Sequence, residues 1–196
     1  MTLASSSPSP SAPRRRLAVY CGANDRVGAK YKEAAYAFGA AMAARDIGVV
    51  YGGCSTGLMG AVANGCLHAG GEVIGVLPDV LGEREPGHPG LSQLLRVPDM
   101  HTRKAVMTAF ASAFVALPGG YGTLDELFEA LTWRMIGTHA HPIALYDVDG
   151  YWSHLVQFID KATSEQLVTQ AARDYFFVDD DTGRLLDRLF PIPMPR

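Results

Sequence analysis

Residues 117–129 read LPGGYGTLDELFE, in which glycines and a threonine precede acids at the point where a helix is expected to begin. Glycine lets the backbone approach a ligand closely and turn its N–H groups toward an anion, and the positive end of the following helix strengthens such a site. A carboxylate in the first helical turn, such as Glu126, stays ionised because the helix macrodipole favours the anion. An ionised carboxylate beside a phosphate suits a glycosidic carbon that becomes positively charged in the transition state.

A structural explanation also fits Glu126. The run Thr123-Leu124-Asp125-Glu126 has the spacing of a capping box, in which Thr123 caps the helix and Glu126 reaches back to the cap amide. The same helix is expected to bury an apolar stripe, from which Glu126, Glu129 and Thr132 point away. The stripe consists of Leu124, Leu127, Phe128, Leu131 and Met135. The spacing alone leaves both interpretations of Glu126 open.

A second helix is expected to open at Asp99, in the run DMHTRK, with Asp99 as its cap. Arg103 and Lys104 then lie close to the helix start, where the dipole disfavours cations. This unfavourable position indicates a functional role for Arg103 and Lys104, although a solvated basic pair is the alternative.

Three other loops contain unusual residues: CGAN (21–24), YGGCSTGLMG (51–60) and LPDVLGERE (77–85). Gly52 and Gly53 in the second of these loops, and Gly119 in LPGGYGT, are expected to line a ligand site, although each glycine pair also fits an ordinary tight turn. No loop ends in the GK[ST] of a P-loop, and none is a GxGxxG followed by a ribose-binding acid.

Other polar clusters favour structural interpretations. His139 and His141 lack the further ligands that a metal site needs, so loop histidines are expected. Asp179 to Asp181 are typical of a solvated helix start. Cys21, Cys54 and Cys66 have no CxxC spacing and are expected to be small buried residues, with Cys54 placed where it could line the site.

Seven short apolar runs must position these loops, and segments of helical period separate them. The runs are LAVYCG (17–22), IGVVYGG (47–53), EVIGVLP (72–78), LLRVP (94–98), AFVALPGG (113–120), PIALYD (142–147) and YFFVD (175–179). This alternation predicts an α/β, Rossmann-like, doubly wound parallel sheet of about seven strands flanked by helices. Ligands bind such sheets beyond the carboxyl ends of the strands, which is where the glycines lie.

Composition narrows the class of protein. The chain has 196 residues, 48% of them hydrophobic, so one domain over 17–196 is predicted, after a disordered tail over 1–16. A net charge of -3 argues against nucleic-acid and membrane partners. The odd cysteine count favours a reducing cytoplasm, and neither a signal peptide nor a membrane span is expected.

The motifs YGGCSTGLMG, GGEVIGVLP, MHTRK and LPGGYGTLDE, in this order, together resemble the LONELY GUY family of cytokinin-activating phosphoribohydrolases. The resemblance runs from about Leu17 to the final helix. It implies a homodimer without redox cofactor or metal. It also implies hydrolysis of the N-glycosidic bond of cytokinin riboside 5'-monophosphates and/or AMP, a nucleoside monophosphate being the ligand.

The resemblance places the family's catalytic pair on Arg103 and Glu126. It places ligand contacts on the following residues: Glu85, Lys104, Gly120, Tyr121, Gly122, Thr123, Leu124, Asp125 and Thr132. The chain departs from the family pattern at Ala23-Asn24, where Ser-Ser is common, at Cys54, where a third glycine is common, and at Thr102, where Glu or Gln is common. These departures affect the expectation of which nucleotide base is preferred more than the expectation of which reaction is catalysed.

Two other functions are alternatives to the one that this resemblance implies. Proteins of the family have often been labelled lysine decarboxylases, but no Schiff-base lysine in a cofactor pocket is evident in the sequence. A non-catalytic module that binds or senses nucleotides would keep the glycine loops, but it would need neither Arg103 nor Glu126.

Overall fold

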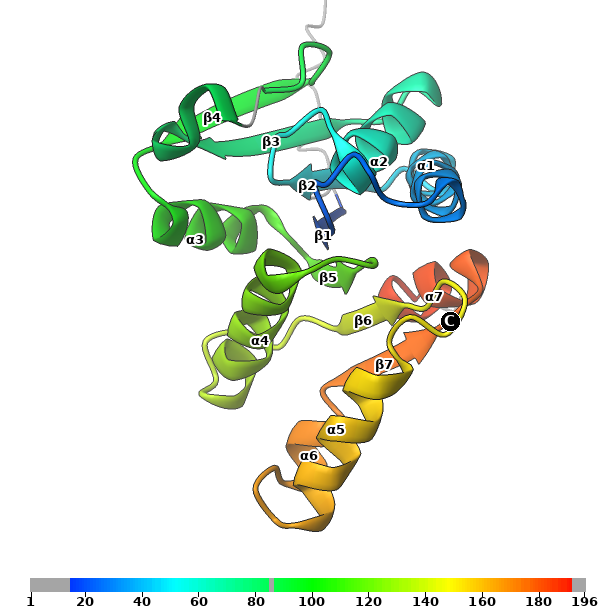
Figure 1. The fold of residues 1–196 in the computed structure, drawn as a ribbon, viewed down its shortest axis with the longest axis vertical. Coiled ribbons are helices and arrows are strands. Elements are labelled where there is room, and N and C mark those ends of the chain that lie inside the picture. Colours follow the sequence, from blue (N-terminus) through cyan, green and yellow to red (C-terminus); the bar gives the residue numbers. More distant parts are fainter. Residues whose placement is uncertain (1–14, 85–86, 192–196) are drawn as a thin grey trace, which may run out of the picture.

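The computed structural model describes residues 15–84 and 87–191, which form one seven-stranded sheet with helices on both faces (Figure 1). The strands are β1 (Arg16–Tyr20), β2 (Gly48–Tyr51), β3 (Val73–Pro78), β4 (Gln93–Val97), β5 (Ala113–Ala116), β6 (Ile143–Tyr146) and β7 (Phe176–Asp179). Their order is β4-β3-β2-β1-β5-β6-β7, and every pairing is parallel. The predicted fold class and all seven strands are confirmed.

The topology creates one switch point. From β1 the chain winds outward through β2, β3 and β4, then returns to pair β5 with β1, as in the register Leu17↔Ala113. The strands from β5 to β7 continue in the other direction. A crevice opens beyond the carboxyl ends of β1 and β5, because the connections that leave these two strands go to opposite faces of the sheet.

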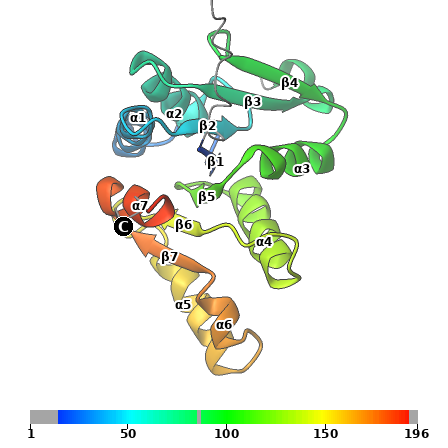
Figure 2. The ribbon, with the colours of Figure 1, turned by 180° about the vertical axis from the view of Figure 1, so that it is seen from behind.

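The helices cover the two faces of the sheet. They are α1 (Ala29–Ala43), α2 (Gly57–His68), α3 (Met100–Phe110), α4 (Tyr121–Met135), α5 (Ser153–Ser164), α6 (Gln170–Arg173) and α7 (Thr182–Leu189), with a 3-10 turn η1 (Asp79–Arg84). In Figure 1, α1, α2 and α7 lie on one side of the sheet and α3 and α4 on the other. Seen from behind, α5 and α6 extend together beyond the β7 edge (Figure 2).

Alternate strand residues divide the core into two layers, because successive side chains on a strand point to opposite faces. Leu17 and Val19 of β1 pack with Phe38 of α1, whereas Ala18 and Tyr20 pack in the layer that contains Met107 of α3. Each of the seven strands contains buried residues, and four of them, β2, β3, β5 and β6, are buried along their whole length. Burial on both faces explains the nearly continuous apolar runs in the sequence.

Two details differ from the sequence expectations. β1 begins at Arg16, inside the segment 1–16 that was predicted to be a tail, and Arg16 Nε lies 2.8 Å from a Glu72 carboxylate oxygen. In α4, Phe128 and Met135 were predicted to face the core, but they are 38% and 58% exposed. Residues 1–14 of the predicted tail lie outside the described residues. No helix of the described part of the chain is long and apolar enough to cross a membrane.

Candidate active site

A cavity of about 330 Å³ lies at the switch point, where the loop after β1 meets α2, α3 and the start of α4. Arg103 and Glu126 line it, together with Gly120, Gly122 and Thr123. These five residues come from two motifs that are some twenty positions apart in the chain. The fold therefore brings MHTRK and PGGYGTLDE to one cavity, as the sequence predicted.

Helix α3 carries Arg103 into this cavity from its first turn. Asp99 caps the helix as predicted, since its carboxylate accepts a hydrogen bond of 2.7 Å from the Thr102 N–H. Arg103 and Lys104 are 4% and 6% exposed, so they are not a solvated basic pair. Two cations buried at the positive end of a helix are unfavourable unless carboxylates or a ligand compensate them.

Glu126 is the carboxylate that faces Arg103. The Glu126 Oε1 atom lies 3.3 Å from Arg103 Nη2, and both side chains are only 4% exposed. Arg103 Nη1 also lies 3.8 Å from the Met100 sulfur, whereas Arg103 Nε is buried without a hydrogen-bond partner among the described residues. A buried guanidinium with an unused donor is typical of a binding site, because such a donor is costly unless a ligand or water satisfies it.

The guanidinium of Arg103 rests on the backbone of Gly52. A Cβ atom at Gly52 would lie 2.0 Å from Nη2 of Arg103, which no real contact allows. Gly52 therefore leaves room for the arginine, although it does not itself line the cavity. Gly53 does not reach the cavity; it adopts φ 81° and packs against Leu77 and Leu94.

The predicted capping box does not form. Helix α4 begins at Tyr121, with Gly120 as its N-cap and no side chain capping it. Thr123 and Glu126 are therefore the third and sixth helical residues, and both are buried. The helix starts early because glycines carry the turn, which leaves the first N–H groups without a side-chain acceptor and available to an anion. Glu126 lies beyond the first turn of α4, where the influence of the macrodipole has fallen off, and its side chain faces Arg103.

Close packing holds the glycine turn against its neighbours. A Cβ atom at Gly119 would lie 2.0 Å from the Thr123 hydroxyl oxygen, so only glycine fits there. The N–H of Gly22, at the end of β1, donates to the Pro118 carbonyl over 3.1 Å. The loops after β1 and β5 are thus joined across the switch point, and both contribute to the cavity.

Lys104 joins α3 to α4 and does not line the cavity. Its ammonium lies 3.0 Å from an Asp125 oxygen and 2.7 Å from a Glu129 oxygen. Burial lowers the pKa of Lys104, but the hydrogen bonds to Glu129 and Asp125 outweigh it and raise the pKa above its usual value. Lys104 is therefore a charged brace next to the Arg103–Glu126 pair.

The other predicted ligand contacts are spread more widely. Tyr121 is 94% exposed and Leu124 packs against the core layer of α3, so neither lines the cavity. Thr132 lies on a different face of α4, where it lines an apolar groove and its hydroxyl donates to the Phe128 carbonyl. Glu85 lies outside the described residues.

Several residues that surround the pair were given no ligand contact by the sequence, although the CGAN loop was named. Met100, Asn24 and Cys21 line the cavity, and it is Cys21, not Cys54, that does so. Burial, and then the charge of Glu126, raises the pKa of the Cys21 thiol, so the thiol stays protonated. Only the position of Cys21 and Asn24 directly after a β-strand, in the CGAN loop, could have indicated their role.

Tyr20 lies under the site at the end of β1 and was also missed. Burial, followed by the charges of Glu126 and Glu129, raises the pKa of the Tyr20 phenol well above its usual value. Tyr20 therefore remains neutral. Its apolar strand context gave no sign of this position.

The polar groups expected to be structural are so in the described structure. His139 Nε2 lies 3.0 Å from the Ala130 carbonyl, and its Nδ1 lies 3.2 Å from the N–H of His141, so both ring nitrogens are used. Asp181 caps α7 by accepting from the Arg184 N–H. The described residues contain no group of three or more His, Cys, Asp or Glu side chains that could hold a metal.

The doubly wound parallel sheet, with its cavity at the switch point, defines a Rossmann-like α/β protein. The family model described as "Possible lysine decarboxylase" matches residues 59–189. The chain is 42% identical over 175 residues to the probable cytokinin riboside 5'-monophosphate phosphoribohydrolase LOGL6 of Oryza sativa subsp. japonica, covering 89% of this chain and 70% of that protein. It is 44% identical to LOG3 of Arabidopsis thaliana, with 89% and 81% covered. The chain belongs to this LOG family of phosphoribohydrolases.

Solved structures with the same fold are more distant in sequence. The molybdenum cofactor carrier protein of Chlamydomonas reinhardtii matches with a TM-score of 0.68 and 20% identity, covering 91% of this chain and 99% of that protein. The molybdenum cofactor binding protein of Rippkaea orientalis matches with a TM-score of 0.68 and 17% identity, with 89% and 94% covered. At these identities the likeness concerns the Rossmann-like fold alone.

Proposed function

We propose that this chain is an N-glycosidic phosphoribohydrolase that acts on cytokinin riboside 5'-monophosphates and/or AMP. The products would be a free adenine-type base and ribose 5-phosphate. The observation that carries the proposal is the buried Arg103–Glu126 pair, 3.3 Å apart, in a cavity that also contains the uncapped start of α4. The LOG relatives named above bear this activity in their names.

The glycine turn would bind the 5'-phosphate of the substrate. Gly120, Gly122 and Thr123 line the cavity at the N-terminus of a helix of 15 residues, where free N–H groups and the macrodipole favour an anion. With the phosphate at this end, the ribose lies toward Glu126. Lys104 adds a nearby positive charge, although its carboxylate partners hold it outside the cavity.

Glu126 and Arg103 account for the cleavage step. As the bond from the anomeric carbon to the base nitrogen breaks, its electron pair leaves with the base and positive charge develops on the sugar. The Glu126 carboxylate stabilises that charge and accepts a proton from the water whose oxygen attacks the anomeric carbon. Arg103 holds the carboxylate in place and offers its unused Nε–H donor to the substrate.

The contacts of Lys104 argue against a lysine decarboxylase. A lysine that forms a Schiff base must lose its proton, which requires a lowered pKa. Two carboxylates raise the pKa of Lys104, the lysine beside the site, so it stays protonated.

The assembly that we propose is a homodimer, with an apolar groove between α4 and α5 as the contact. Phe128, Met135, Phe158 and Leu167 line the groove and are 38%, 58%, 65% and 82% exposed. Monomeric proteins rarely leave so many large apolar side chains together in water. We expect Phe158→Glu to yield a monomer in analytical ultracentrifugation, and a monomeric wild type would contradict the proposal.

We also propose a cytoplasmic location. Its support is that Cys21, Cys54 and Cys66 are all free and buried, which fits a reducing compartment. Localisation of a tagged full-length chain by microscopy tests it.

The function is tested by chromatography of the purified protein after incubation with AMP, N6-isopentenyladenosine monophosphate and the matching unphosphorylated ribosides. The proposal expects free base from the monophosphates and little from the ribosides. Glu126→Gln, which keeps the size of the side chain and removes its charge, should abolish the release. Binding of the monophosphates without release would contradict the hydrolase and favour the alternative, a nucleotide-binding or sensing module.

A further inference from the structure

The loop after β6 reads DVDGYW (147–152) and has a tightly built shape. Asp147 Oδ1 accepts a hydrogen bond of 2.9 Å from the N–H of Trp152, which closes the loop. Asp149 and Gly150 adopt φ values of 57° and 70°, in the left-handed region. Trp152 is 2% exposed and anchors the loop in the core layer of α4. Such a conformation costs free energy at Asp149, so the loop indicates a requirement for one particular geometry.

Tyr151 is the residue that this geometry presents to the glycine turn. Its hydroxyl donates to the Gly119 carbonyl over 2.6 Å, across 32 positions of sequence. The ring meets Tyr31 of α1 and Trp152 edge-on, with ring centroids 5.8 Å and 4.9 Å apart. Lys30 of α1 pairs with Asp149 of the same loop. Tyr151 is therefore fixed on several sides before it reaches Gly119.

The peptide whose carbonyl Tyr151 holds is one that could rotate easily. It joins Gly119 to Gly120, and two glycines let a peptide plane rotate with little steric cost. Because a trans peptide is planar, the Gly120 N–H points opposite to the Gly119 carbonyl. Fixing the carbonyl toward Tyr151 therefore fixes the direction of the Gly120 N–H. A flipped peptide would turn the carbonyl away from Tyr151 and present an acceptor where the turn otherwise presents a donor.

A second cavity of about 330 Å³ supports a link to ligand binding. Tyr151, Gly119 and Gly120 line it, and it shares Gly22, Asn24 and Gly120 with the cavity of the Arg103–Glu126 pair. The hydroxyl of Tyr151 thus meets the turn beside this second cavity, which neither Glu126 nor Arg103 lines.

We propose that Tyr151 is a positioning residue for the phosphate end of the substrate. By holding the Gly119 carbonyl it keeps the Gly120 N–H in the anion-binding orientation. The inference rests on the proposed function in that the anion is the 5'-phosphate of the nucleotide. It predicts that Tyr151 affects the binding of phosphate-bearing ligands and leaves the cleavage step at Glu126 unchanged.

The test compares Tyr151→Phe with Tyr36→Phe. Both substitutions remove one hydroxyl from a half-exposed tyrosine, since Tyr151 is 40% and Tyr36 is 41% exposed. The Tyr36 hydroxyl lies 3.0 Å from His68 Nδ1, outside both cavities, so it is a matched control. We expect Tyr151→Phe to raise KM for AMP about two- to tenfold with kcat unchanged, as the loss of one hydrogen bond implies. Tyr36→Phe should change neither constant.

A binding measurement separates this inference from the proposed function. Calorimetry with AMP, with inorganic phosphate and with adenosine is carried out in a Glu126→Gln background, where no turnover is needed. We expect Tyr151→Phe to weaken AMP and phosphate by the same factor and to leave adenosine unchanged. Equal weakening of all three ligands would indicate a general structural defect and overturn the inference, as would unchanged phosphate binding. If the wild type binds AMP but does not hydrolyse it, the proposed function is wrong. The binding measurements with Tyr151→Phe still test the inference about Tyr151 in that case.

Discussion

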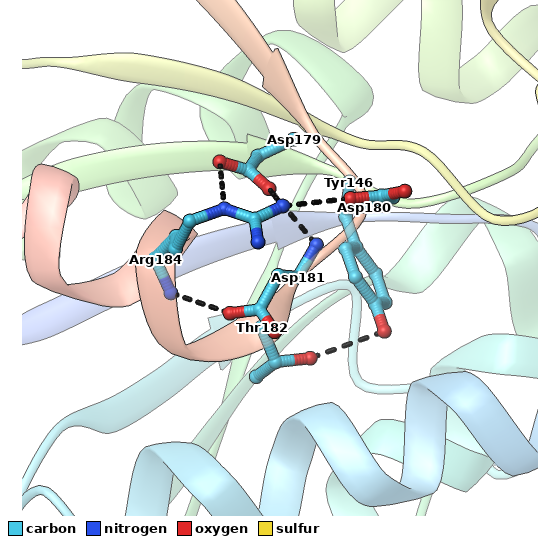
Figure 3. A network of polar contacts seen from close by, with 6 residues as sticks. All are labelled: Tyr146, Asp179, Asp180, Asp181, Thr182 and Arg184. Carbon is cyan, nitrogen blue, oxygen red and sulfur yellow. Dashed lines mark hydrogen bonds and ion pairs between the residues drawn. The ribbon is translucent and has the colours of Figure 1, made fainter.

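Of the arginine–carboxylate contacts among the described residues, those of Arg184 and Arg103 are built in opposite ways. At the start of α7, the guanidinium of Arg184 donates to both carboxylate oxygens of Asp179 and to Asp180 (Figure 3). The backbone N–H of Arg184 donates to the Asp181 carboxylate. The side chain of Arg184 is 65% exposed. In the cavity, Arg103 is 4% exposed, and its carboxylate partner among the described residues is Glu126, at 3.3 Å.

The difference between the two arginines shows which features indicate a ligand-binding site. The Arg184 cluster is rich in contacts, and its members satisfy one another at the surface, where such pairs contribute little. Arg103 has fewer contacts and an unused donor in a place that water hardly reaches, where unpaired polar groups are costly. A buried charged group with an unused hydrogen-bond donor therefore indicates a ligand site. A large number of hydrogen bonds within a surface cluster does not indicate one.

The largest effect is expected where the carboxylate of the buried pair is neutralised. Glu126→Gln should lower kcat for AMP by about 10²–10⁴-fold, because a base and a stabilising charge are lost together. Asp180→Asn, which removes a carboxylate from the surface cluster, should leave kcat unchanged. Steady-state kinetics with AMP measures both, and comparable losses in the two variants would contradict the comparison.

A smaller effect is expected when the arginine is displaced without being changed. Gly52→Ala places a methyl group where Arg103 Nη2 now lies, since the added Cβ would be 2.0 Å away. We expect a loss of about 10²-fold in kcat/KM, which is the order of cost for a displacement of about 1 Å at a site. Gly28→Ala is the control, because the nearest atom to its Cβ is 3.9 Å away. Full activity of Gly52→Ala would show that the position of Arg103 is unimportant.

Much of the fold could be predicted because local patterns decide it. The apolar runs gave all seven strands, since strands buried on both faces must be apolar throughout. The sequence also indicated that Arg103 and Lys104 are not ordinary surface cations, because both stand in the first turn of a helix capped by Asp99.

Other features depend on contacts between distant segments and could not be predicted. The capping box at Thr123 was wrong because glycines started α4 three residues earlier, which periodicity does not record. The contacts of Lys104 with Asp125 and Glu129, and of Tyr151 with Gly119, each join segments that are twenty or more residues apart. Only the folded chain brings such partners together.

The ion pairs of Lys104, next to the site, should affect the stability of the fold more than the catalytic rate. Lys104→Met keeps the side-chain length and leaves Asp125 and Glu129 without their cation. We expect the free energy of unfolding to fall by about 1 kcal/mol near neutral pH, between the limits for surface and buried pairs. Urea denaturation measures this difference.

The pH dependence of that difference follows from the raised pKa of Lys104. A group whose pKa is raised by folding stabilises the protein fully below its unfolded pKa, about 10.4 for lysine, and this contribution is lost as the pH rises through the folded pKa. The stability gap between wild type and Lys104→Met should therefore be constant up to about pH 9 and shrink above about pH 10.4. A gap that persists unchanged at higher pH would mean that packing, not charge, causes it.

The smallest effect is expected at the surface cluster itself. Arg184→Gln removes the cation that three aspartates surround, so that Asp179, Asp180 and Asp181 repel one another at the start of α7. The pKa of Asp179 is lowered mainly by its hydrogen bond with Arg184, so its contribution is present above the unfolded pKa and is lost as the pH falls through the folded one. Thermal unfolding should therefore show a slightly lower Tm for Arg184→Gln at neutral pH, with little difference in acid. Because the cluster is exposed, salt should also reduce the difference, and the kinetics with AMP should not change. A salt-independent loss of activity in this variant would mean that contact-rich surface clusters can also carry function, and the comparison with Arg103 would fail.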